Sequence, residues 1–209
     1  MELENQENNM EMYFNSSSIE DVEKLIKQIN LIHERYSNDY FETGIVQKYN
    51  LKKTLSTVPQ NHILNYRLNL HESINDYMIY GDFRGLDFRY RVKTTEAILN
   101  KIRRFKERTE KYPVHKWMND IFGARIILSS EEFKKLEDSL DFWTNEFHLK
   151  SSYEKRTASY HGYHIYFQNE KNYFFPWELQ IWDEKDVKNN IESHIKYKRS
   201  FSNLYSEQI

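Results

Sequence analysis

Basic side chains gather between residues 91 and 104, at spacings that could bring several of them onto one phosphate group. Arg91 and Lys93 alternate along a segment rich in aromatic and branched residues, so that on a strand both point to the same face. Lys101 follows on a predicted helix. Arginine binds phosphate through paired hydrogen bonds and lysine adds a point charge, so these three cations could hold a triphosphate. A solvated basic helix would have the same composition, and this alternative stays open at the level of sequence.

Two carboxylates stand beside predicted apolar strands. Asp120 precedes the apolar run 124–128 and could hold Mg²⁺ against phosphate oxygens, or form a turn or helix cap instead. Glu178 lies in a segment where Trp177, Leu179 and Ile181 alternate with polar residues, so its carboxylate needs a partner. A metal ion or a substrate hydroxyl would provide that partner, and so would a structural salt bridge.

Residues 160–164 form a third candidate set. On a strand, Tyr160, Gly162 and His164 share one face, and Gly162 leaves room above the backbone. Tyr160 could then stack on a nucleobase while His164 reaches a phosphate or hydroxyl, although both could be ordinary strand residues. His161 and His164 point to opposite faces, which argues against a metal site formed by this pair.

The elements that position these residues follow from the hydrophobic pattern. Helical spacing predicts N-terminal helices over 18–32, 41–55 and 59–70. Strands are predicted over 77–80, 86–92, 124–128, 147–153, 160–167 and 173–182. Helices are predicted over 94–107, over 129–140 behind a Ser129–Glu132 capping box, and after residue 184. This order predicts an α/β (α+β) fold with a mixed β-sheet of about five strands flanked by helices.

Composition excludes several classes of protein. The 209 residues include no cysteine, which excludes disulfides and thiolate chemistry, and only 5 glycines, with no P-loop or dinucleotide fingerprint. With 30 basic and 32 acidic side chains, any contact with nucleic acid would depend on a local patch. No apolar run is long enough to span a membrane, and the acidic first residues do not resemble a secretory signal. We therefore expect a cytoplasmic protein with no membrane partner.

Together the candidate sets resemble the synthetase domain of the RelA/SpoT family, including small alarmone synthetases, over about residues 75–200. That family carries R-x-K-x-x-x-S-I-x-x-K, D-[IL]-x-G-x-R, G-Y-[RQ]-[SA]-x-H and E-x-Q-I-R in this order. The residues that match are Arg91, Lys93, Ile98 and Lys101, then Asp120, Gly123 and Arg125, then Tyr160 and His164, and finally Glu178, Gln180 and Ile181.

The resemblance implies an ATP-dependent pyrophosphokinase that transfers the β,γ-pyrophosphate of ATP to a ribose 3′-hydroxyl. It implies that ATP is bound by Arg91, Lys93 and Lys101. It also implies that Asp120 and Glu178 are catalytic and hold Mg²⁺. The acceptor is expected to contact Tyr160, His164, Gln180 and Arg156.

The resemblance also implies a domain division. Residues 73–209 would form the synthetase-like catalytic domain, and residues 16–72 would form N-terminal helices packed on it. Residues 1–15 are polar and are predicted to be mobile. The chain contains no counterpart of the family's metal-binding hydrolase domain, so we expect an enzyme that synthesises and does not degrade.

Departures from the family motifs concentrate on the acceptor side. In the first motif, Ala97 replaces Ser. In the third motif, Ser159 replaces Gly, His161 replaces Arg or Gln, and Gly162 replaces Ser or Ala. In the fourth motif, Trp182 replaces the final Arg. Toxic small alarmone synthetases (toxSAS proteins) have a similar size and a lone synthetase domain. Some of them modify the 3′-terminal adenosine of the uncharged tRNA CCA end, which stops translation.

Three functions therefore compete at the level of sequence. We favour the tRNA-modifying toxin, which would have a cognate antitoxin protein as a partner. Synthesis of (p)ppGpp from GDP or GTP is the second hypothesis. An inactive module that binds nucleotides or an antitoxin is the third.

Overall fold

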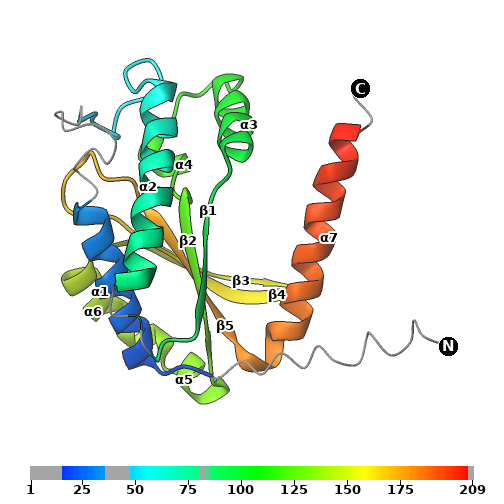
Figure 1. Ribbon diagram of the computed structural model, residues 1–209. Coiled ribbons are helices and arrows are strands. Elements are labelled where there is room, and N and C mark those ends of the chain that lie inside the picture. The colour runs from blue at the N-terminus through cyan, green and yellow to red at the C-terminus, as the bar shows by residue number, and fades with distance from the viewer. Residues whose placement is uncertain (1–15, 36–47, 81–82, 84, 207–209) are drawn as a thin grey trace.

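The computed structural model describes residues 16–35, 48–80, 83 and 85–206. The segment 1–15, which was predicted to be mobile, lies outside the described residues. Five strands form one sheet in the order β1-β2-β5-β4-β3 (Figure 1). Their bounds are β1 Phe88–Val92, β2 Phe122–Leu128, β3 Leu149–Thr157, β4 Tyr160–Phe167 and β5 Trp177–Asp183. Strands β2 and β5 run parallel and all other neighbours run antiparallel, which confirms the predicted mixed sheet.

Helices cover both faces of this sheet. The elements are α1 Ile19–Arg35, α2 Gln60–Tyr80, α3 Thr95–Lys106, α4 Val114–Trp117, α5 Ser130–Lys134, α6 Leu136–Phe147, a 3-10 turn η1 Glu184–Asp186, and α7 Val187–Ser206. In Figure 1, α1, α2 and α6 lie on one side of the sheet and α7 lies on the other. Among the described residues, no helix is long and apolar enough to cross a membrane.

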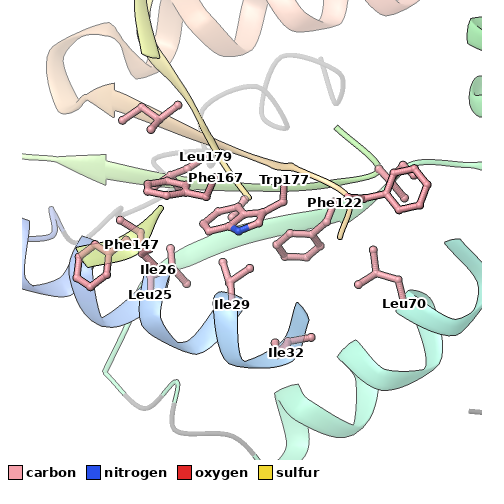
Figure 2. Packing of buried hydrophobic residues seen from close by; sticks show 14 of the residues in the cluster. Leu25, Ile26, Ile29, Ile32, Leu70, Phe122, Phe147, Phe167, Trp177 and Leu179 are labelled. Carbon is pink, nitrogen blue, oxygen red and sulfur yellow. The ribbon is translucent and has the colours of Figure 1, made fainter. Parts of the chain in front are cut away.

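The alternation along β5 divides the sheet into an apolar face and a polar face. Trp177, Leu179 and Ile181 are fully buried on the apolar face. They belong to the same hydrophobic cluster as Leu25 and Ile29, which repeat at helical spacing on α1, and Figure 2 shows Trp177 beside this helix. Each such side chain stabilises the fold by about 1.5–3 kcal/mol. Because this face holds the core, the polar residues of β5 must face the other side.

Helix α3 begins where the sequence predicts it, and its start places a cation near the sheet. The Thr94 hydroxyl accepts a hydrogen bond from the Ala97 amide (3.2 Å), which caps the first turn. Ile98 and Ile102 are buried against the core. These two anchors fix the rotation of the helix and thereby the direction of Lys101, which lies between them in sequence.

The structure corrects four predicted elements. Residues 77–80 are the end of α2 and not a strand, because the helix continues past the buried Ile74. Residues 48–55 of the predicted helix 41–55 form turns, and the rest of that range lies outside the described residues. The helix predicted over 129–140 is broken at Lys135 into α5 and α6. Only half of the capping box forms, because the Glu132 carboxylate accepts from the Ile19 amide of α1 and not from Ser129.

The N-terminal helices share one hydrophobic cluster with the sheet. Ile26 of α1 and Leu70 of α2 belong to the same buried cluster as the apolar residues of β2, β4 and β5. The boundary predicted between residues 72 and 73 falls inside α2. The division into N-terminal helices and a catalytic domain that begins at residue 73 therefore remains a prediction.

Candidate active site

Polar side chains from all five strands meet on the face of the sheet opposite to the α1 side. The register pairs Gly123 and Arg125 of β2 with Glu178 and Gln180 of β5. It pairs His164 of β4 with the same Gln180. Since paired residues share a face, these side chains form a row across the sheet, with the Glu178 carboxylate near its middle.

The cations on one side of this row are bound to Asp120. Its two oxygens accept hydrogen bonds from Lys93 Nζ (2.6 Å) and Lys101 Nζ (2.7 Å), and all three side chains are 16% exposed. Burial would raise the pKa of Asp120, but the two ammonium groups outweigh it and hold the pKa below its ordinary value. Asp120 is therefore neither a turn-forming nor a helix-capping residue here, and the basic run is not a fully solvated helix.

Glu178 is a buried carboxylate whose two oxygens both accept hydrogen bonds. Oε1 accepts from His164 Nδ1 (2.9 Å) and from the Tyr166 hydroxyl (3.0 Å), and Oε2 accepts from Gln180 Nε2 (3.1 Å). Arg91 Nη2 lies 3.8 Å from Oε2. Burial would raise the pKa of Glu178, but the hydrogen bond from His164, together with the positive charge of Arg91, outweighs it and keeps the pKa low. The carboxylate is thus ionised and oriented from several sides.

A directed chain of hydrogen bonds leads to this carboxylate. Trp182 Nε1 can only donate, and it donates to the Tyr160 hydroxyl oxygen (3.0 Å). Burial raises the pKa of Tyr160 to about 12, so the phenol keeps its proton and donates it to His164 Nε2 (2.9 Å). His164 then carries its own proton on Nδ1 and donates to Glu178. Each donor in the chain from Trp182 to Glu178 therefore meets an acceptor.

Tyr160 is enclosed by its neighbours. It is 7% exposed, and its ring contacts those of Trp182 and of His194 on α7 edge-to-face. Lys155 Nζ lies 5.2 Å from the ring centre. The stacking role predicted for Tyr160 requires an open ring face, whereas this ring is covered by the protein.

Gly162 and Trp182 are complementary departures from the family motifs. A Cβ added to Gly162 would lie 2.8 Å from Trp182 Cδ1 and 3.0 Å from the Ile181 carbonyl oxygen. Real Cβ atoms do not approach so closely, so the indole occupies the space that a side chain at position 162 would take. The two substitutions therefore depend on each other. Gly162 and the Trp182 indole together form what we call the floor of the site.

Arg125 lies on this indole and borders a pocket. Its guanidinium is 3.6 Å from the Trp182 ring centre and donates to Gln180 Oε1 (2.8 Å from Nη2). Arg89 and Arg91 line the same pocket of about 180 Å³, together with Gly123, Glu178 and His194. Arginine side chains of β1 and β2 thus face the side of Glu178 that Lys93 and Lys101 also approach.

Arg156 is the one predicted site residue that the structure does not bring to the others. It is paired with His161 across the β3–β4 hairpin, and Nη2 contacts His161 Nε2 at 3.0 Å. His161 also binds Asp186 (2.6 Å), and it lies on the face opposite to Tyr160 and His164. Lys155, one residue earlier, faces the site instead. This corrects the prediction for Arg156, because neighbouring strand residues point to opposite faces.

Three further residues reach the site from positions that are not specified by the family motifs. Tyr153 of β3 stacks on His164, with ring centres 5.1 Å apart and an angle of 4° between the rings. Tyr166 donates to Glu178, and burial together with the charge of Glu178 raises its pKa. Both could have been found by extending the alternation from Tyr160 and His164 along β4 and across the hairpin. His194 reaches the site from α7, and no local pattern indicates this.

Magnesium fits the donor chemistry of Asp120 and Glu178. Mg²⁺ prefers carboxylate oxygens and is usually bound by one or two of them, with water and phosphate oxygens completing its shell. The two carboxylates are close enough for the charge of Asp120 to affect the pKa of Glu178. Within the described part of the chain, no group of three or more His, Asp or Glu side chains could hold a metal alone.

The sequence places this site in a known family. The model described as the region found in RelA/SpoT proteins matches residues 90–202, which include all the residues of the row. The chain belongs to the RelA/SpoT family. As a RelA/SpoT protein it is an enzyme, a pyrophosphotransferase. Among curated proteins, no sequence matches the chain.

Three solved structures are similar to part of this chain. Small alarmone synthetase 2 from Bacillus subtilis is 21% identical, with a TM-score of 0.41, over 68% of this chain and 82% of that one. Small alarmone synthetase 1 from the same organism is 22% identical, with a TM-score of 0.41, over 62% and 71%. A GTP pyrophosphokinase family protein from Streptococcus pneumoniae is 18% identical, with a TM-score of 0.39, over 66% and 72%.

Proposed function

We propose that this RelA/SpoT protein transfers the β,γ-pyrophosphate of ATP to the ribose 3′-hydroxyl of the 3′-terminal adenosine of uncharged tRNA, and so acts as a toxin that inhibits translation. The observation that carries the proposal is the position of Glu178 between two unlike halves of the polar face. Cations of β1, β2 and α3 lie on one side of it, and His164 with its aromatic neighbours lies on the other. A triphosphate fits the cationic half, and an acceptor nucleotide fits the aromatic half.

In the donor half, Arg91, Lys93 and Lys101 bind the phosphates of ATP. The two lysines are bound to Asp120 in the structure, so phosphate oxygens take over these ammonium groups when ATP binds. Asp120 and Glu178 would hold Mg²⁺, which would neutralise charge that develops on the transferred group. Transfer of this kind depends on positioning and charge neutralisation more than on covalent chemistry.

In the acceptor half, Glu178 accepts the proton of the attacking 3′-hydroxyl, whose oxygen forms a bond to the β-phosphorus of ATP while the bond from that phosphorus to the α-phosphate oxygen breaks and AMP leaves. Its pKa is held low, so it acts as a base through geometry more than through basicity. Gln180 and His164 fix the orientation of the carboxylate through hydrogen bonds to Oε2 and Oε1. The catalytic unit would be residues 73–209, with the helices before it packed on the sheet.

The choice of tRNA over a free guanine nucleotide is supported by the rebuilt floor of the site. Trp182 and His194 cover Tyr160, the residue that the family motif assigns to stacking on an acceptor base. The face stays open toward the edge strand β3, where Lys155 is exposed. An open edge admits the end of a large acceptor. A toxin acting on tRNA would work in the cytoplasm and would need an antitoxin.

Label transfer from γ-labelled ATP tests this proposal. The protein is incubated with deacylated tRNA, with GDP and with GTP, and with tRNA whose terminal adenosine lacks the 3′-hydroxyl. We expect label on deacylated tRNA and none on the 3′-deoxy form. Label on guanine nucleotides alone would overturn the tRNA assignment and leave (p)ppGpp synthesis. No label on any acceptor would favour an inactive binding module.

A further inference from the structure

Tyr153 is an exposed aromatic ring at the edge of the acceptor half. It is 48% exposed, whereas Tyr160 is 7% exposed. Tyr153 is paired with His164 across the β3–β4 hairpin, and its ring lies parallel to the imidazole at 4°, with the centres 5.1 Å apart. One side of the ring therefore rests on His164, the ring also neighbours Tyr166, and about half of the side chain is exposed to solvent.

Tyr153 also contacts two side chains, His164 and Tyr166, that each bind the Glu178 carboxylate. The imidazole beneath it binds Glu178 (2.9 Å), and its ring lies 6.3 Å from that of Tyr166, whose hydroxyl donates to the same carboxylate (3.0 Å). A base stacked on Tyr153 would thus hold its ribose beside Glu178. Arg91, Lys93 and Lys101 lie on the opposite side of this carboxylate, so the two substrates would not compete for the same space.

A positive charge stands next to the ring on the same face. Lys155 is two residues further along β3, is exposed, and extends over the ring of Tyr160 at 5.2 Å. An exposed aromatic ring beside a cation is the combination that binds single-stranded nucleic acid, because every base has a π-face and every nucleotide has a phosphate.

We infer that Tyr153 is the stacking surface for the base of the acceptor nucleotide, and that Lys155 contacts the phosphate that precedes it. Tyr160, by contrast, is a positioning residue that orients His164 and Glu178 from below. This inference rests on the proposed function and deepens it, because it names the residues that hold the acceptor. It moves base recognition from β4 to the edge strand.

The test compares four substitutions. Tyr153→Ala removes the ring, Tyr153→Phe keeps the ring and removes the hydroxyl, and Tyr153→Leu keeps an apolar cover on His164 without a π-face. Tyr112→Ala is the control, because Tyr112 is exposed to a similar extent, 37%, but lies on the loop before α4. For each variant, KM is measured for deacylated tRNA and for ATP by label transfer. The affinity for a CCA trinucleotide is measured separately without ATP.

We expect Tyr153→Ala and Tyr153→Leu to raise the KM for tRNA, and to weaken trinucleotide binding, by about 5- to 150-fold, the range found for loss of one stacked base. The KM for ATP should stay within about twofold, and Tyr112→Ala should resemble the wild type. Tyr153→Phe keeps the π-face but loses the hydrogen bond to Tyr166, so it should retain the affinity for tRNA and for the trinucleotide that Tyr153→Ala loses. The inference is overturned if Tyr153→Leu binds the acceptor as well as the wild type, since the residue would then only cover His164. An equal rise in both KM values would also overturn it.

Failure of the proposed function would look different. If the wild type labels only GDP or GTP, tRNA is the wrong acceptor, and the same variants assayed with GDP still decide the role of Tyr153. If the wild type labels nothing, trinucleotide binding by the wild type and by Tyr153→Ala decides it.

Discussion

Gly162 offers a sharp test of how the floor of the site is built. A Cβ at this position would meet the Trp182 ring at 2.8 Å and the Ile181 carbonyl oxygen at 3.0 Å. The carbonyl belongs to a central strand, and the indole is held by Tyr160 and covered by Arg125, so neither can move without losing other contacts. Overpacking of this kind costs about 1–3 kcal/mol. We therefore expect Gly162→Ala to lower the free energy of unfolding by about 2 kcal/mol, which corresponds to a fall in Tm of roughly 4–8 °C.

Gly123 provides the matched control. It lies on the same face of the sheet, but a Cβ there would approach no atom closer than 3.5 Å, which is ordinary contact with Arg91. Gly123→Ala should leave the free energy of unfolding within about 0.5 kcal/mol of the wild type. The assay is urea denaturation of both variants, each also made in a Trp182→Leu background. There the cost of Gly162→Ala should fall by at least half, because the ring that it meets is gone. Equal stability of the two alanine variants, or a cost that does not depend on Trp182, would refute this account.

Two further predictions concern the ion pairs and the hydrogen-bond chain. The folded-state pKa of Asp120 lies below its unfolded value near 3.9, so its ion pairs stabilise the fold fully above that pH and are lost as the pH falls through the folded pKa. Asp120→Asn should thus be about 3 kcal/mol less stable than the wild type at pH 7. The difference between the urea midpoints of the two proteins should shrink as the pH falls from about 4 through the folded-state pKa of Asp120. A difference that stays constant over this range would contradict the prediction. Trp182→Phe removes the donor to Tyr160 and should cost about 1–2 kcal/mol. The double variant with Tyr160→Phe should cost less than the sum of the two, whereas strict additivity would show that the two side chains are uncoupled.

Local sequence patterns predicted the helices and strands whose structure is decided by residues close to one another in the sequence. The alternation along 177–182 placed Glu178 and Gln180 on one face and the apolar residues on the other, as the structure has them. Helix α3 lies within the predicted range 94–107, and the periodicity of α1 matches its buried face. In each case the property that decides the structure repeats every two residues or every turn, so the sequence displays it directly.

The errors arise where distant parts of the chain decide the outcome. Aromatic and branched residues over 77–80 favour a strand, but they continue a helix that is already packed through Ile74. Arg156 was assigned to the acceptor site, but it lies on the other face of β3, because that face follows from the pairing with β4 across the hairpin. Tyr160 is covered by His194, which lies 34 residues later on α7. Such packing cannot be read from the motif that contains Tyr160.

The central claim is that the carboxylate of Glu178, oriented by His164 and Tyr166, is the group around which pyrophosphate transfer takes place. The most direct measurement is single-turnover label transfer from γ-labelled ATP to deacylated tRNA by the wild type and by Glu178→Gln, at saturating substrate. Glutamine keeps the shape and can still accept the hydrogen bonds of Oε1, but its amide NH2 cannot accept the Gln180 hydrogen bond of Oε2, so the stability of the variant is measured by urea denaturation. We predict a fall in rate of about 10²- to 10⁴-fold under conditions in which the variant is fully folded. Transfer by Glu178→Gln at the wild-type rate would contradict the account.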